Sequence, residues 1–182
     1  MRGISLYRNI LCMTAVVMAL FMGTALAVPR AMTVDDAVIA GIAPGSALSY
    51  VRSIYGEPDG EKTKRTGNYP THLVDYYGEG FVITYDIFGG AQNPLIQSIE
   101  STNAALVMPS GIHVGMKIAE VQQIFSDIQE PFRRDEKNNQ YTSPRFYVEV
   151  SDEKKGIRTV VFDVDKKGVI QKIFIYDRYG ID

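Results

Sequence analysis

The chain has 182 residues, 46% of them hydrophobic, and a formal net charge of −2. This length is enough for one ordinary domain or two small ones, and the apolar content is that of a globular protein and not of a disordered one. The nearly balanced charge argues against a nucleic-acid partner, which would require a basic patch.

The first 27 residues have the pattern of a secretory signal peptide. Arg2 and Arg8 precede an uncharged stretch over residues 9–28, which contains the small-x-small sequence Ala25-Leu26-Ala27. That order predicts cleavage after Ala27 and export to the periplasm or the extracellular space. The alternative is an uncleaved membrane anchor, because the apolar run approaches the roughly 18–20 residues that span a bilayer. We expect no membrane span after signal removal.

The cysteine content restricts the chemistry of the mature chain. Cys12 is the only cysteine, lies inside the predicted signal and has no lipoprotein box before it. The chain from Val28 onward therefore has no disulfide, no thiolate nucleophile and no cysteine-built metal site. Signal removal leaves 17 basic and 21 acidic residues, a formal net charge of −4. Stability must then come from packed apolar surface.

Two helices are expected before the first strands. Residues 33–40 are predicted to form a brief helix that Gly41 ends. A longer helix follows, capped by Ser46 and stopped by Gly56 and Pro58. Its apolar stripe consists of Leu48, Val51, Ile54 and Tyr55.

A polar connection and three strands follow this helix. Residues 59–70 are expected to form a loop with room for one short strand. Residues 72–77, 81–87 and 95–102 carry aromatic and β-branched residues in the period-two alternation of half-buried strands.

The motif of the longer helix recurs 70 residues later. Residues 41–55, GIAPGSALSYVRSIY, correspond to residues 111–125, GIHVGMKIAEVQQIF, and predict a helix from about Met116 to Phe125. Further strands are expected at residues 145–150, 156–164 and 168–177. We therefore predict an α+β fold of two tandem repeats, each a helix or helix pair packed on a three- to four-stranded antiparallel sheet. The expected parts are residues 1–27 for the signal peptide, 28–105 for repeat 1 and 106–182 for repeat 2.

The glycine motif, followed by Tyr55-Gly56-Glu57-Pro58 and aromatic-rich strands, resembles two related groups of proteins. One is the BamE-type (SmpA/OmlA) small outer-membrane lipoproteins, although this chain has no lipobox. The other is the β-lactamase-inhibitor-protein-like fold, which repeats a helix-plus-sheet unit and presents a concave sheet surface to a partner protein. The resemblance covers most of residues 41–177 and implies this fold and a protein partner.

Aromatic residues of the sheet are the candidate binding residues. Phe174 and Tyr176 share one face of the last strand, and Tyr77 and Tyr147 are expected to point away from the helices as well. Exposed aromatic side chains often dominate protein recognition. The alternative is that Phe174 and Tyr176 fill the interface between the two repeats. The predicted protein-binding residues are Tyr77, Tyr147, Phe174 and Tyr176.

No catalytic or metal-binding constellation is recognised in the sequence. His72 and His113 are the only histidines, and neither a nucleophile elbow nor a metal-spaced histidine pair accompanies them. Residues 163–168 begin like a calcium loop, but the lysines in it favour a hairpin turn with Gly168 at positive φ. The acid pairs Asp75 with Asp86 and Glu149 with Asp163 could meet across strands, although solvated sheet faces are the ordinary case. We expect no cofactor and no metal.

These observations predict a non-enzymatic, exported protein-interaction module of the cell envelope or the extracellular space. Its expected partner is another envelope or secreted protein, and not a nucleic acid. A narrower alternative is an inhibitor of a secreted or periplasmic hydrolase. A further alternative is an uncharacterised hydrolase that uses His72 or His113 with nearby acids.

Overall fold

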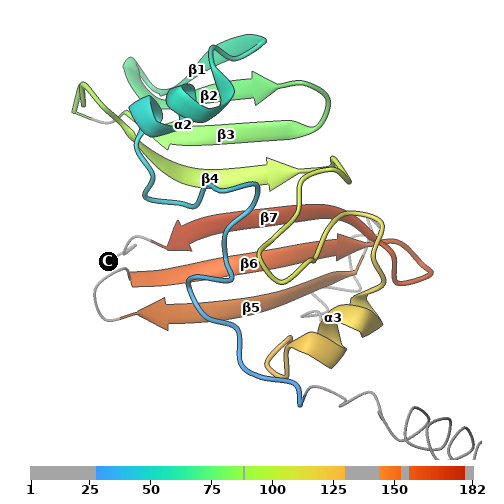
Figure 1. The fold of residues 1–182 in the computed structure, drawn as a ribbon. Coiled ribbons are helices and arrows are strands. Elements are labelled where there is room, and N and C mark those ends of the chain that lie inside the picture. The colour runs from blue at the N-terminus through green and yellow to red at the C-terminus, as the bar shows by residue number, and fades with distance from the viewer. Residues whose placement is uncertain (1–27, 88, 130–143, 153–155, 179–182) are drawn as a thin grey trace, which may run out of the picture.

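A computed structural model describes residues 28–87, 89–129, 144–152 and 156–178 (Figure 1). The predicted signal peptide lies outside these residues. The described part of the chain forms one antiparallel sheet of seven strands in the order β1-β2-β3-β4-β7-β6-β5, with two short helices. The elements are α2 (Leu48–Tyr55), β1 (Gly60–Thr66), β2 (Tyr69–Tyr77), β3 (Phe81–Asp86), β4 (Leu95–Ser101), α3 (Ile118–Ile124), β5 (Arg145–Asp152), β6 (Gly156–Val164) and β7 (Ile170–Arg178).

The predicted fold of two repeats, each with a helix packed on its own small sheet, is wrong. β1–β4 and β5–β7 are meanders, but β4 pairs with β7 and makes them parts of one continuous sheet. The pairing runs from Ser98 opposite Tyr176 to Ser101 opposite Ile173. Periodicity could not reveal this junction, because a strand shows the same alternation of side chains whether its edge meets water or another strand.

The recurring glycine motifs do have matching backbone contacts. In both, the chain before a helix is hydrogen-bonded to the beginning of a strand, β4 or β7. Gly41 and Gly111 both have a φ of 84°, a conformation that favours glycine. Gly45 N donates to Ile96 O (2.7 Å) in the first motif, and Gly115 N donates to Ile170 O (2.8 Å) in the second. Leu48 N likewise donates to Pro94 O (2.9 Å), and Ile118 N donates to Gly168 O (2.8 Å).

Most expected elements lie near their predicted positions, and the errors fall in irregular segments. Residues 33–40 form turns and not a helix. Ser46 does not cap α2, because its hydroxyl accepts a bond from Ala43 N instead. The apolar stripe of α2 is only partly buried, since Val51 is 0% exposed and Ile54 is 46% exposed. The polar stretch before β2 contains a full strand, β1.

One face of the sheet is covered by α2, α3 and two irregular segments. Residues 28–47, which we name the N-terminal strap, run from α3 across β5, β6 and β7 to α2, and residues 102–117 lead from β4 to α3 (Figure 1). The two segments meet where Ala40 N donates to Val107 O. Their buried apolar side chains belong to the core: Met32, Val34, Ala37, Ile39, Ile42, Met108 and Ile112.

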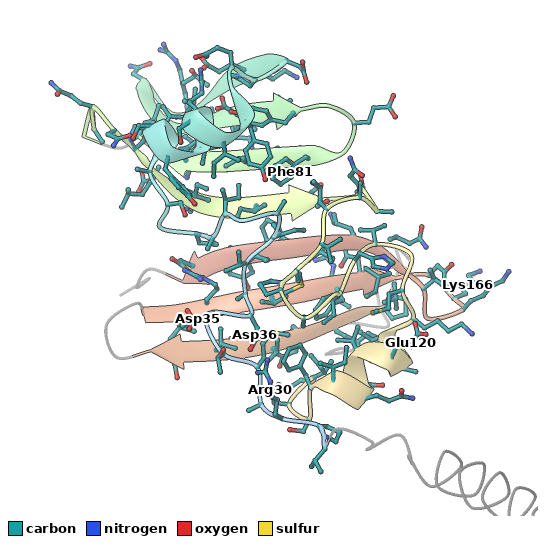
Figure 2. The ribbon with its side chains drawn as sticks, viewed as in Figure 1. Arg30, Asp35, Asp36, Phe81, Glu120 and Lys166 are labelled. Atoms are coloured by element: carbon teal, nitrogen blue, oxygen red, sulfur yellow. The ribbon has the colours of Figure 1, made fainter. Side chains whose placement is uncertain are left out.

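The beginning of the strap is attached to α3. Arg30 N donates to Ile124 O, and Ser126 N donates to Arg30 O. The Arg30 guanidinium lies over the ring of Phe125 and makes two hydrogen bonds, of 2.7 and 2.6 Å, to the Asp36 carboxylate (Figure 2). These bonds lower the pKa of Asp36 to about 2, so the carboxylate stays charged at neutral pH.

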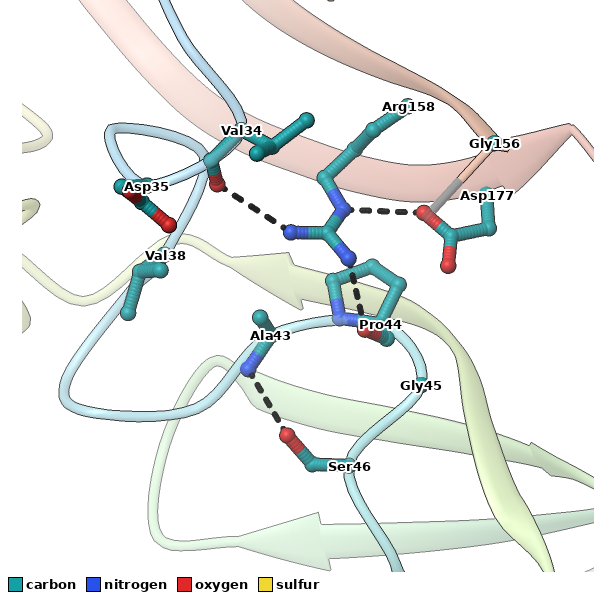
Figure 3. Close-up of a pocket in the computed structure, with 10 residues that line it drawn as sticks. All are labelled: Val34, Asp35, Val38, Ala43, Pro44, Gly45, Ser46, Gly156, Arg158 and Asp177. Carbon is teal, nitrogen blue, oxygen red and sulfur yellow. Dashed lines mark hydrogen bonds and ion pairs between the residues drawn. The ribbon is translucent and has the colours of Figure 1, made fainter. Parts of the chain in front are cut away.

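Arg158 of β6 fixes the middle of the strap on the sheet (Figure 3). Its side chain is 7% exposed, and its Nε donates to Asp177 Oδ1 of β7 at 2.8 Å. The other guanidinium nitrogens donate to three strap carbonyls, those of Val34 (3.2 Å), Ala37 (3.4 Å) and Pro44 (2.7 Å). A buried arginine is tolerated only when it is paired and hydrogen-bonded, so this set of acceptors specifies how the strap crosses β6.

Replacing Arg158 by Met should lower the free energy of unfolding by about 3–5 kcal/mol, because the Asp177 carboxylate and three carbonyls lose their donor. The matched control is Arg145→Met, which breaks an ion pair to Asp163 from a side chain that is 61% exposed. That change should cost less than about 1 kcal/mol. Urea unfolding measures both, and equal losses would contradict the role given to Arg158.

Candidate functional site

The sheet face opposite α2, α3 and the strap is the candidate site, and we name it the open face. Every helix and both long irregular segments of the described residues lie on the other face (Figures 1 and 2). Strand pairing places the open-face residues in rows that cross the sheet. One row contains Lys62, Val74, Thr84, Ser98, Tyr176, Thr159 and Glu149, and the next contains Tyr76, Val82, Glu100, Phe174, Val161 and Tyr147.

Burial distinguishes the two faces. On β3, Phe81, Ile83 and Tyr85 are at most 3% exposed and belong to the core, whereas Val82 and Thr84 between them are half-buried. Val74 of the open face is buried but is not part of the core cluster. The open face is therefore a separate surface with its own packing.

Aromatic side chains lie in the centre and toward both edges of the open face. Phe174 and Tyr176 are half-buried neighbours on β7, with ring centroids 5.1 Å apart. Tyr147 on the edge strand β5 and Tyr76 on β2 are also half-buried. Because β7 joins the two meanders, the Phe174–Tyr176 pair stands near the middle of the sheet.

A hollow of about 500 Å³ lies beside this pair on the open face. Tyr76 and Phe174 stand in the same row, on strands β2 and β7, with Val82 and Glu100 between them. Three strand spacings of about 4.8 Å place the backbones of these two residues about 14 Å apart. The lining residues are Lys64, His72, Val74, Tyr76, Val82, Thr84, Gln97, Ser98, Glu100 and Phe174.

The charges on the two sides of the hollow differ. On the β7 side, Lys172 Nζ lies 3.4 Å from a carboxylate oxygen of Glu100 and 3.4 Å from one of Asp163. On the β1 side, Lys62 Nζ lies 5.2 Å from the Tyr76 ring centroid, and Lys64 is exposed. No described carboxylate forms an ion pair with either Lys62 or Lys64. The β1 side thus carries positive charge that the described residues do not neutralise.

The structure places three of the four predicted binding residues on the open face. These are Tyr147, Phe174 and Tyr176, whose role in binding stays a prediction. The expected outward orientation of Tyr77 is wrong, because the residue is 9% exposed on the covered face and its ring packs beside Tyr55 and Phe81.

The sequence predicts that Tyr77 faces outward, but Tyr76 is the tyrosine of this pair that lies on the open face. Both positions are aromatic, and the buried position two residues before Tyr77 holds Asp75, which interrupts the apolar alternation of β2. Because Asp75 is charged, the sequence pattern indicates that its face of β2 is exposed, whereas this face is the covered one. Only the pairing of Tyr77 with Phe81 identifies the inward position.

The two histidines lie on different elements, and His72 stands opposite Asp86 in the pairing of β2 with β3. His72 Nδ1 lies 2.9 Å from Thr71 Oγ1 on β2, and His113 Nδ1 lies 2.9 Å from Val114 O in the segment before α3. In the described part of the chain, no group of three or more His, Asp or Glu side chains could hold a metal ion.

The two pairs of acids that could meet across strands do not come together. Asp75 and Asp86 lie on opposite faces, since Asp75 pairs with Ile83 and Asp86 with His72. Asp163 forms an ion pair with Arg145, with Oδ1 2.9 Å from Nε, and Glu149 stands four residues further along β5.

The hairpin turn predicted for residues 163–168 is confirmed. Gly168 has a φ of 75°, and its N–H donates to Asp165 O. The Asp165 side chain accepts bonds from the N–H groups of Lys167 and Val169, so it organises the turn.

A polar cluster lies inside the covered face beneath α2. Arg52 of α2 contacts Asp75 Oδ2 at 3.2 Å, Glu61 at 3.1 Å and the Glu57 carboxylate. Asp75 and Tyr85 are 0% exposed, and Asp75 Oδ1 and the Tyr85 hydroxyl have no hydrogen-bond partner. Burial raises the pKa of Asp75, and Arg52 opposes that rise.

No family model, curated protein or solved structure matches the chain. None of the helices among the described residues has the length and apolar composition needed to cross a membrane.

The stability of the protein should depend on the protonation of Asp75. Because its pKa is raised in the folded state, the folded protein holds this proton more tightly than the unfolded chain does. The associated stability is present at acidic pH and is lost as the pH rises through the folded-state pKa. Relative to Asp75→Asn, the free energy of unfolding of the wild type should fall as the pH rises above about 4, the ordinary pKa of an aspartate. Urea unfolding of both proteins across this range measures the difference, and a difference that grows with pH in favour of the wild type would refute the assignment.

Proposed function

We propose that the chain is an exported, non-enzymatic protein-interaction module whose open face binds another envelope or secreted protein. The observation that supports this most is the set of half-buried aromatic side chains on a sheet face that carries no described helix or strap. Large aromatic side chains supply much of the binding energy of protein interfaces when a partner buries them.

The construction of the sheet favours a preformed binding surface. Phe174 and Tyr176 lie on β7, a strand that is paired on both sides, by β4 and by β6. Side chains on a central strand need little ordering when a partner binds, which reduces the entropic cost of association. The paired charges of Lys172, Glu100 and Asp163 at the margin of the aromatic pair suit the polar rim of an interface.

The resemblance to the BamE-type and inhibitor-like groups supports the same proposal, since the inhibitor-like fold presents a sheet surface to a partner protein. An inhibitor of a secreted hydrolase would use the same open face and would differ only in the partner. His72 and His113 lie on separate elements, and their Nδ1 atoms contact Thr71 Oγ1 and Val114 O, an arrangement that gives no support to a hydrolase mechanism.

A photo-crosslinking amino acid at Tyr176 should capture a specific partner protein in the producing cell. The control carries the same amino acid at Tyr50, which is 49% exposed on α2 and belongs to the covered side. Both positions are tyrosines, so the two variants differ mainly in the face they probe. Equal capture from the two positions, or capture from Tyr50 alone, would contradict the proposal.

Export predicts a defined amino terminus. Protein recovered from the periplasm or the medium should begin at Val28, because cleavage is expected after Ala27. Intact-mass measurement and amino-terminal sequencing decide this. A protein that stays in the cytoplasm with residues 1–27 attached would contradict the export part of the proposal.

A further inference from the structure

We propose that the hollow between Tyr76 and Phe174 binds an extended, carboxylate-rich polypeptide segment of the partner protein. This inference rests on the proposed function and adds the chemical class of the segment that is bound. Its basis is the combination of an apolar floor, unused polar side chains and positive charge on one side of the hollow.

The floor and walls of the hollow suit one apolar side chain of the partner. Val82 and Glu100 lie between Tyr76 and Phe174 in one row, and Val74 lies beside Tyr76 on β2, so the two valines supply apolar surface next to the larger rings. An apolar group placed between the two rings would lose its contact with water on several sides. Burial of this kind is the main favourable contribution to association.

Polar groups beside this floor suit the main chain of the segment. Thr84, Gln97 and Ser98 line the hollow, and their side chains make no hydrogen bond to another described residue. An extended segment has free N–H and C=O groups that such side chains can satisfy, whereas the main chain of a helix is already hydrogen-bonded internally. These polar side chains therefore favour an extended segment.

Charge complementarity selects an acidic segment. Lys62 and Lys64 project from β1 on one side of the hollow, and no described carboxylate pairs with them. Glu100, on the other side, is engaged by Lys172 at 3.4 Å. Carboxylates of a bound segment would meet the two lysines, which favours acidic partners and disfavours basic ones.

Three synthetic peptides of equal length test this inference. They share one central Phe and carry Glu, Gln or Lys at the flanking positions. Binding to the purified protein is followed by nuclear magnetic resonance, through the backbone amide shifts of Thr84 and Ser98 on the floor. The Glu peptide should shift these resonances and bind about tenfold more tightly than the Gln peptide, and the Lys peptide should bind most weakly.

Two double variants of equal charge give the matched control. Lys62→Gln with Lys64→Gln should reduce binding of the Glu peptide to the level of the Gln peptide. Lys166→Gln with Lys167→Gln removes the same charge from the β6–β7 turn, where both lysines are exposed, and should leave binding unchanged. Equal losses in the two double variants would overturn the inference, because they would show only a general attraction of charge.

The remaining outcomes separate this inference from the proposed function. Capture of a partner by the crosslinker at Tyr176, with no binding of the Glu peptide, overturns the acidic-segment inference alone. Failure of both experiments overturns the proposed function as well. Binding to phosphatidylglycerol vesicles that depends on Lys62 and Lys64, without peptide binding, would assign the positive side to a membrane surface and also overturn the inference.

Discussion

Burial of a single sheet face depends on the N-terminal strap and on the arginine that fixes it. α2 and α3 have eight and seven residues, so each is only about 10–12 Å long. A sheet of seven strands is about 29 Å wide. Two such helices cannot cover it, and the strap and residues 102–117 fill the centre with apolar side chains. Irregular segments leave their own carbonyls without partners, and Arg158 supplies donors to three of them.

Two buried arginine–aspartate pairs lie on the covered face, and their surroundings differ. Arg158 and Asp177 are both nearly inaccessible and the arginine is fully engaged, so the pair positions a segment. Arg52 is shared among Asp75, Glu61 and Glu57, while one oxygen of Asp75 has no partner. The first arrangement specifies the crossing of the strap, and the second leaves a carboxylate whose protonation affects stability.

The strands β2 to β7, the two helices and the turn at Gly168 could be predicted from the sequence, because each depends on local alternation, an apolar stripe or a glycine. The pairing of β4 with β7 could not, since it depends on which strand edges meet. The open face was predicted through Phe174, Tyr176 and Tyr147, where alternation is regular. The place of Tyr76 on the open face could not be predicted, because the buried Asp75 interrupts the pattern of β2. The place of Lys62 and Lys64 could not be predicted either, because β1 has no apolar alternation.

The proposed function follows from this one-sided cover, because a sheet that buries one face presents the aromatic rings of the other. Hydroxyl-radical footprinting of the purified protein, with no partner present, tests that claim most directly. Tyr76, Tyr147, Phe174 and Tyr176 should be modified much faster than Tyr77 and Tyr85, which are 9% and 0% exposed. If the first group is protected as strongly as Tyr85, another part of the chain covers the open face and the account is wrong.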